Sequence, residues 1–351
     1  MGKHQAVYLF VLIFIATGLV YPNDGDLSIH FLELGNKYTG DSVYINYGDI
    51  DILIDAGSRQ SSAITIKAYI DNYIRDNKLE YVIATHAHQD HIAGFYTTGG
   101  RTGILDAYEI GTIIDFPLTN STTAVYKKYI NARDDAVTRG AVHYNALQCY
   151  NNEDGAQRVY DLGGVQLEIL YNYYYEHRNR RENNYSVCVR IIQDDKQYLF
   201  TGDLEREAEE KLVEFYDENF GGLGHCVLYK GGHHGSSTSS GEMLLAAITP
   251  EYVCICTCAG SREYSRRIPN QFPAQEFIDR IAPYTDKVYI TTLTINYLAN
   301  KYTSFNGNIT FLVSDGAVTI IGSDNERKLK DTEWFQNYRK MPAAWMADNF
   351  L

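Results

Sequence analysis

A dense group of metal-binding residue types follows a short apolar segment, and no other stretch constrains the fold of this chain as strongly. Residues 84–94 read ATHAHQDHIAG, directly after the apolar residues YVI. In an extended loop, His86 and His88 project to the same side, where one cation can bind both imidazoles. Asp90 and His91 lie past a turn and are able to reach a second cation. This spacing predicts a metal site and disfavours the alternative, a solvated loop that happens to be rich in histidine.

Three other predicted strands also end in residue types that bind metals. Asp55 ends the segment LIDAG, Asp203 ends LFTGD, and His233 and His234 follow a strand in LYKGGHHGSSTSS. Each short motif alone also fits an ordinary polar turn, but a rigid sheet would hold all of them at fixed positions. The two oxygens of Asp203 are able to bridge two metal ions about 3.5–4 Å apart. Imidazole with carboxylate suits Zn, Mn or Fe, and the pattern does not distinguish among them.

The order of apolar segments predicts an α/β fold with two strand-rich halves. Apolar or alternating runs predict strands at 27–35, 42–48, 51–57 and 81–85, and again at 165–171, 185–192, 197–203, 226–230 and 251–258. Helical spacing or amphipathic character predicts helices at 64–77, 123–140 and 205–216. Because both halves combine strands with helices, we expect two sheets that face each other with helices outside, in one domain.

The net charge limits the kinds of partner. The chain carries a formal net charge of -13 over 351 residues, whereas a broad surface for non-specific nucleic-acid binding needs clustered Lys and Arg. The charge therefore disfavours such a surface. It is compatible with a nucleotide substrate whose phosphates contact bound cations in place of side chains.

The cysteines do not predict a disulfide framework. Cys254, Cys256 and Cys258 alternate in YVCICTC, so they point to one face of one strand, where they are poorly placed to bridge one another. A soft-metal site is the alternative, but small buried hydrophobic side chains are the favoured interpretation.

Both ends of the chain are predicted to lie outside the main domain. Lys3 precedes an apolar run at 6–20 that is shorter than the ~20 residues of a membrane span, which predicts a signal peptide over residues 1–22. We therefore expect a secreted or extracytoplasmic protein; the alternative is an uncleaved N-terminal anchor, which would be its membrane contact. Residues 324–351 show no clear period and predict a peripheral C-terminal tail.

Five blocks of the sequence resemble signature blocks of the metallo-β-lactamase superfamily. The blocks are IDAG, THAHQDHIAG, NNYSVCVRI, FTGDLE and GGHHGSSTSS. They are most similar to the branch that contains the hydrolase domain of the DNA-uptake protein ComEC and secreted phosphorylcholine esterases. The resemblance covers about residues 27–323. It implies a four-layer αββα sandwich, an α/β (α+β) fold, over a domain at 23–323.

The resemblance also implies a role for each residue of the site. It assigns six metal ligands to two sites: His86 and His88 to the first, Asp90, His91 and His234 to the second, and Asp203 as the bridge. Asp90 and His233 are the implied catalytic residues, because Asp90 would steady the nucleophile and His233 would contact the scissile phosphate or carbonyl. Asp55 is implied to brace the metal loop through hydrogen bonds.

One position departs from the wider superfamily. Many members have a further first-site histidine, whereas this chain has RENNYSVCVR there, with Asn184 and Ser186 as implied substrate-binding residues. The same branch shows this Asn/Ser pattern, so the departure supports the assignment to the branch and implies a weaker first metal. The loop FLELGNKYTGDS at 31–42 is also longer than the compact LGxGD form of relatives, which implies an altered wall of the cleft.

The resulting hypothesis is an exported metal-dependent hydrolase in which a metal-bridged hydroxide attacks phosphodiester bonds, in nucleic acid, phosphorylcholine or a related small molecule or polymer. Two divalent ions, Zn or Mn, are the expected cofactors. The Tyr/Arg-rich loop at 171–184 is expected either to be solvated or to hold phosphate, a base or choline. The alternatives are a carbon-ester, lactone or β-lactam hydrolase of the same fold, and an exported binding module without turnover. The sequence makes no prediction of the oligomeric state.

Overall fold

The structure, a computed structural model, describes residues 22–23 and 25–346. The predicted signal peptide or anchor therefore lies outside the described residues, apart from its last residue, and so do residues 347–351 of the predicted tail. None of the helices in the part that is described has the length and apolar character that a membrane span requires.

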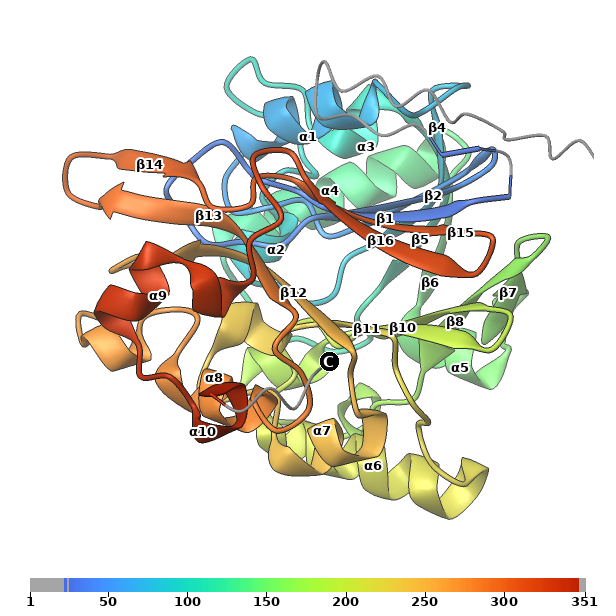
Figure 1. Ribbon diagram of the computed structural model, residues 1–351. Helices are drawn as coiled ribbons and strands as arrows, with labels where there is room; N and C mark the ends of the chain where they lie inside the picture. Colours follow the sequence, from blue (N-terminus) through green and yellow to red (C-terminus); the bar gives the residue numbers. More distant parts are fainter. Residues whose placement is uncertain (1–21, 24, 347–351) are drawn as a thin grey trace, which may run out of the picture.

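Two mixed sheets of eight strands each form the centre of the molecule (Figure 1). The first sheet has the spatial order β16-β15-β1-β2-β3-β4-β5-β6, and the second has the order β14-β13-β12-β11-β10-β9-β8-β7. The strands of the first sheet are β1 (Leu27–Phe31), β2 (Val43–Tyr47), β3 (Ile50–Ile54), β4 (Lys78–Ile83), β5 (Glu109–Asp115), β6 (Val142–Asn145), β15 (Ile309–Ser314) and β16 (Ala317–Gly322). Those of the second sheet are β7 (Val159–Asp161), β8 (Val165–Leu170), β9 (Cys188–Gln193), β10 (Lys196–Phe200), β11 (Leu228–Lys230), β12 (Tyr252–Ala259), β13 (Val288–Asn296) and β14 (Lys301–Ser304). In each sheet an antiparallel part continues into a parallel run, from β3 to β6 in the first and from β10 to β13 in the second.

Helices cover the outer face of each sheet, so the molecule has four layers (Figure 1). Helices α1, α3 and α4 lie over the first sheet, and α6, α7 and α8 lie over the second. The helices are α1 (Ser62–Ile70), α2 (Gln89–Ile92), α3 (Ile104–Ala107), α4 (Ala124–Thr138), α5 (Ala146–Asn151), α6 (Arg206–Phe220), α7 (Glu242–Ile248), α8 (Gln275–Ile281), α9 (Glu333–Tyr338) and α10 (Ala343–Met346). The predicted αββα sandwich is confirmed. Parallel strands need long crossover connections, and the helices between them supply these connections.

The layer between the two sheets is apolar and aromatic. Phe31 of β1 stacks on Phe200 of β10 with 6.4 Å between ring centroids. Tyr198 of β10 packs edge-on against Phe311 of β15 at 5.8 Å. All four side chains are fully buried. Since each contact joins the two sheets, this layer fixes the relative position of the strand ends that carry the site.

Helix α1 is shorter than the helix predicted at 64–77 and ends at Ile70. Just beyond it, the side-chain amide of Asn72 donates hydrogen bonds to the backbone carbonyls of Ala68 and Tyr69. Asparagine competes in this way for carbonyls that a longer helix would use, so the apolar spacing overestimates the length of the helix.

The cysteines are confirmed as buried side chains. All six are buried and free within the described part of the chain. Cys254 and Cys256 of β12 belong to the apolar layer between the sheets. They fill core volume, as the alternation in this strand predicts.

The C-terminal segment packs more closely than the predicted peripheral tail. Trp334 and Phe335 of α9 and Trp345 of α10 are buried in the same apolar cluster as Phe277 of α8. The indole N–H of Trp345 donates a hydrogen bond to the carbonyl of Thr285 at 2.9 Å. The segment shows no clear period because its helices are short and bury isolated aromatic side chains.

Replacing Trp345 with Ala tests whether the C-terminal segment is part of the folded unit. The change removes a buried indole and should lower the free energy of unfolding by about 3 kcal/mol, measured by urea denaturation. Met346→Ala is the matched control, because this neighbour is 70% exposed and its loss should change the free energy by less than about 0.5 kcal/mol. Equal denaturation midpoints for the two variants would contradict the packing described.

Candidate metal centre

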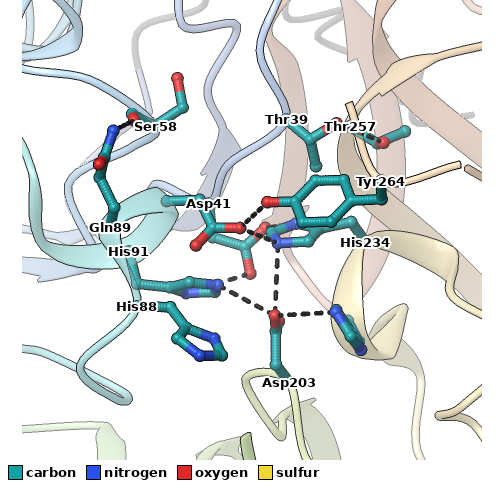
Figure 2. Close-up of polar contacts among 12 residues, drawn as sticks. Thr39, Asp41, Ser58, His88, Gln89, His91, Asp203, His234, Thr257 and Tyr264 are labelled. Atoms are coloured by element: carbon teal, nitrogen blue, oxygen red, sulfur yellow. Dashed lines mark hydrogen bonds and ion pairs between the residues drawn. The ribbon is translucent and has the colours of Figure 1, made fainter. Parts of the chain in front are cut away.

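The metal-binding residue types of both halves meet at the carboxyl ends of parallel strands. The predicted site residues follow four strands: Asp55 follows β3, His86 to His91 follow β4, Asp203 follows β10, and His233 and His234 follow β11. Because neighbouring parallel strands end at the same edge of a sheet, and the two sheets face each other, the four groups converge. Figure 2 shows His91, Asp203 and His234, from the groups after β4, β10 and β11, close together.

Asp203 lies at the centre of this cluster. Its buried Oδ2 atom lies 3.2 Å from Nε2 of His91, 3.4 Å from Nε2 of His234, 3.6 Å from Nε2 of His233 and 3.9 Å from Nε2 of His86. Figure 2 shows the imidazoles of His91 and His234 pointing toward this carboxylate. One carboxylate is thus shared by imidazoles from both halves of the chain, as a bridging ligand requires.

The other donor atoms form two groups beside Asp203. In the first group, Nε2 of His86 lies 3.0 Å from Nδ1 of His88, so both nitrogens face one point. In the second group, Oδ2 of Asp90 lies 3.4 Å from Nε2 of His234. The structure therefore brings together the residues that the sequence assigns to the first site and to the second site, with Asp203 beside both.

Two carboxylates hold the imidazoles from the side away from Asp203. Nδ1 of His91 donates to Asp55 at 2.7 Å, and Asp55 in turn accepts the backbone N–H and the hydroxyl of Thr85, both at 2.8 Å. Nδ1 of His234 donates to Asp41 at 2.9 Å. A carboxylate at Nδ1 fixes the tautomer and the ring orientation, so that Nε2 is left to bind a metal ion.

Asp41 is a site residue that the sequence patterns above do not predict. Four buried residues offer donor atoms that lie within 4.8 Å of one another, namely Asp41, His91, Asp203 and His234. The oxygens of Asp41 face the Nδ1 atoms of both histidines, at 2.9 Å and 3.8 Å, so its contacts are those of an orienting residue. Asp41 also forms an ion pair with Lys230, which is buried at the end of β11.

Gly40 is the sequence signal that points to Asp41. A Cβ atom at Gly40 would lie 2.7 Å from Ser58 and 2.8 Å from the carbonyl oxygen of Asp90. The backbone N–H of Asp41 donates to the same carbonyl at 3.0 Å. The long loop before β2 therefore packs on the backbone of the metal loop, and only glycine fits at this point.

Three site residues have a left-handed backbone. The φ angles are 62° at Asp55, 46° at His233 and 54° at His234. For residues with a side chain, this conformation costs about 1–2 kcal/mol each. Such strain persists where surrounding contacts determine the conformation, and it is typical of functional sites.

The donor set fits divalent cations. Buried atoms without a hydrogen-bond partner include Nε2 of His91, Nε2 of His234 and both carboxylate oxygens of Asp203. Leaving such atoms unsatisfied in the protein interior is costly, and a cation between them would satisfy all four. Imidazole nitrogens with carboxylate oxygens are the donors that Zn and Mn accept.

The carboxylates of the cluster keep two imidazoles protonated, so these imidazoles exchange a proton for a cation when metal binds. Burial opposes the charge on His91, but Asp203 and Asp55 outweigh it and hold the pKa of this imidazole well above its usual value. Burial opposes the charge on His234 too, and Asp203 and Asp41 raise its pKa in the same way. Before metal binds, both imidazoles therefore carry protons that compete with a metal ion at Nε2.

Asn184 and Ser186, predicted to contact substrate, are fully buried. The side-chain oxygen of Asn184 accepts the backbone N–H of Glu205 at 3.1 Å. The hydroxyl of Ser186 accepts the backbone N–H of Asp203 at 3.1 Å, so it holds the central carboxylate in place. These contacts are positional, and a role in substrate binding stays a prediction for both residues.

A cleft of about 490 Å³ opens onto the cluster. The polar residues along it include His88, Asp90, Asn183, His233 and Tyr264. Asn183 belongs to the loop at 171–184, for which ligand binding is one of the two expectations, whereas Tyr264 is not among the residues that the sequence predicts for the site. The cleft leads directly to one residue of the first group and one of the second, so a ligand in it reaches both.

Comparison with known proteins places part of the chain in a family. Residues 35–111 match the family model described as the metallo-beta-lactamase superfamily, and this range includes Asp41, Asp55 and the whole histidine cluster. Residues 35–111 therefore belong to a metallo-beta-lactamase superfamily domain. The resemblance that the sequence blocks show is thereby confirmed.

Relatives of this chain include proteins named for competence and recombination. The chain is 36% identical over 97 residues to competence protein ComA of Neisseria gonorrhoeae. This match covers 28% of this chain and 13% of the relative. The chain is 26% identical over 246 residues to recombination protein 2 of Haemophilus influenzae, covering 69% of this chain and 25% of the relative. The chain thus spans a quarter or less of the length of these two relatives. Their similarity is consistent with the ComEC-like branch.

Among solved structures, the chain is similar to the metallo-beta-lactamase fold protein YhfI from Bacillus subtilis. It is 12% identical, with a TM-score of 0.44, and the match covers 76% of this chain and 96% of that protein.

Metal binding to this domain should release protons. Because the pKa values of His91 and His234 are raised above 6.5, each must lose a proton to bind through Nε2, so affinity for Zn or Mn should increase as the pH rises above that value. Calorimetric titration at pH 7 in two buffers of different ionisation enthalpy measures the number released. His225→Ala, which alters an exposed histidine paired with Glu251, should leave that number unchanged. A heat that is the same in both buffers would contradict the proton assignment.

Proposed function

We propose that the protein is a metal-dependent hydrolase that cleaves phosphodiester bonds with two divalent ions, Zn or Mn. The observation that carries this proposal is the pair of donor groups beside Asp203. His86 and His88 would hold one ion, Asp90, His91 and His234 would hold the other, and the two oxygens of Asp203 would contact both. The unpartnered buried atoms of this cluster support the proposal.

The ions, when bound, would lower the pKa of water to about 7 and so supply a nucleophile at neutral pH. In the hydrolysis, a bond forms between the water oxygen and phosphorus, the bond from phosphorus to one ester oxygen breaks, and the leaving oxygen takes up a proton. The side chains have separate parts in this reaction. Asp90, at the cleft, would orient the attacking water, while His233 would face the phosphoryl oxygens.

The contacts of His233 support a neutral imidazole with its proton on Nε2. Its Nδ1 atom lies 3.0 Å from the hydroxyl of Thr238 and 3.4 Å from the side-chain amide nitrogen of Asn183, which only donates. Nδ1 is therefore the acceptor, which leaves Nε2–H free to donate. Burial lowers the pKa of His233 more than Asp203 raises it, so the ring is neutral at pH 7. Such a donor would stabilise negative charge that develops on phosphorus-bound oxygens.

Phosphodiesters are favoured over carbon esters for two reasons. A pair of ions suits an in-line displacement at phosphorus. The first group here consists of His86 and His88 with no third histidine, since the equivalent region RENNYSVCVR has Asn184 and Ser186, and this counts against the carbon-ester reaction. With a net charge of -13, the chain would bind phosphates through the ions and a few local donors, not through a broad basic surface.

We also propose that the N-terminal segment at 1–22 directs export and is the part of the protein that meets a membrane. This rests on the sequence of the segment, an apolar run at 6–20 after Lys3. Mass spectrometry of the mature protein from the extracytoplasmic fraction tests it. Loss of the segment is the expected result, and an intact N-terminus would favour the anchor.

A substrate panel tests the proposed activity. The protein loaded with Mn or Zn should hydrolyse bis-p-nitrophenyl phosphate, and p-nitrophenylphosphorylcholine and DNA then distinguish the kinds of phosphodiester. Asp203→Ala should abolish this turnover, whereas Asp195→Ala, which alters a side chain that is 91% exposed, should retain it. Hydrolysis of nitrocefin or a lactone without any phosphodiester turnover would replace the proposal with the carbon-centred reaction. Tight ligand binding with no turnover of any substrate would favour a binding module.

Replacing His233 with Ala separates the two histidines of the GGHHGS segment. The variant should keep its full metal content, measured by elemental mass spectrometry, and should lose about 10²–10³ of kcat, because a donor to the developing charge is gone. His234→Ala is the comparison, and it should lose metal. A lower metal content in the His233→Ala variant would exchange the two roles, making His233 the metal ligand and His234 the donor to the phosphoryl group.

A further inference from the structure

Tyr264 reaches the metal cluster from a loop that carries none of the predicted site residues. It lies between β12 and α8, and its hydroxyl donates a hydrogen bond to Oδ2 of Asp90, a partner 174 positions away in the sequence. Figure 2 shows its ring beside His234, with the hydroxyl pointing into the cluster. The carboxylate oxygen that it contacts is the same one that lies 3.4 Å from Nε2 of His234. The phenol therefore lies at the boundary between the donor cluster and the cleft.

The loop is held in place by contacts that do not involve this hydroxyl. Glu263 accepts the backbone N–H of Thr39 at 2.9 Å and pairs with Arg59 at 2.8 Å, which ties the loop to the opposite half of the domain. The ring of Tyr264 stacks on Phe272 with 5.0 Å between centroids and 27° between planes. Because these contacts position the residue, its hydroxyl is not needed to anchor the loop.

Tyr264 is also accessible to a ligand. The residue is 48% exposed, although its hydroxyl touches a buried carboxylate, so one face of the ring is open. It lines the same cleft as His233 and Asn183. A structural tyrosine would bury its ring, whereas this one places a donor at the inner end of the cleft.

We propose that Tyr264 contacts the substrate, and that its hydroxyl donates a hydrogen bond to a non-bridging oxygen of the phosphoryl group. This assignment rests on the proposed function, since it names a residue of the same site. A phenol carries an O–H group and serves as a hydrogen-bond donor. When a cation binds Asp90, the hydroxyl of Tyr264 would donate its hydrogen bond to an anionic oxygen of a ligand in the cleft. Together with Nε2–H of His233, it supplies two donors for the charge that develops on phosphorus-bound oxygens.

Tyr264→Phe removes only the hydroxyl and keeps the stacking on Phe272. In the metal-loaded full chain, calorimetry should show that the variant binds inorganic phosphate about 10- to 100-fold more weakly than the natural protein, as expected for loss of a hydrogen bond to a charged group. The metal content should stay unchanged, and kcat/KM for bis-p-nitrophenyl phosphate should fall by a similar factor. Tyr338→Phe is the matched control: this tyrosine is 51% exposed and lies outside the cleft, and the change should leave all three quantities as they are.

The affinity for phosphate tests this inference, and the hydrolysis of phosphodiesters tests the proposed function, so the two can fail separately. An unchanged affinity for phosphate in Tyr264→Phe, or a loss of metal from it, would overturn the assignment of Tyr264 as a substrate contact. If the natural protein hydrolyses no phosphodiester, the proposed function falls, and the comparison of phosphate affinity still decides whether Tyr264 contacts an anion.

Discussion

The rest of the structure depends on the contacts of the buried Asp203 carboxylate. Four imidazole nitrogens lie between 3.2 and 3.9 Å from one of its oxygens. The imidazoles come from both halves of the chain, so the two sheets must face each other for the cluster to exist. The aromatic layer between the sheets fixes that arrangement. The hydroxyl of Ser186 then holds the backbone of Asp203.

The surrounding charges make this arrangement tolerable in the protein interior. An unpaired buried carboxylate is costly, and each acidic residue around Asp203 has a partner. Asp55 accepts from His91, Asp41 accepts from His234, and Lys230 pairs with Asp41. These contacts direct the Nε2 atoms of both histidines inward, where buried nitrogens and oxygens have no hydrogen-bond partner. The protein thus orients its donors before any cation arrives, which is the property expected of a metal centre.

Much of the fold and of the cluster could be predicted from the sequence, because local patterns encode them. The strand before each motif and the spacing of His86, His88, Asp90 and His91 require only neighbouring residues. Asp41 and Tyr264 escaped prediction for a different reason: their partners are 193 and 174 positions away. Only the tertiary fold brings these pairs together. The close packing of Trp345 likewise depends on contacts that no period in the sequence reveals.

The central claim is that the donors around Asp203 bind two cations in separate places. Anomalous diffraction from crystals of the protein grown with Zn, recorded on both sides of the zinc absorption edge, tests this claim most directly. We predict two peaks that share Asp203, one contacted by His86 and His88 and the other by Asp90, His91 and His234. No ordered ion at the cluster, or a single ion bound by the carboxylate of Asp41 in place of Asp203, would contradict it.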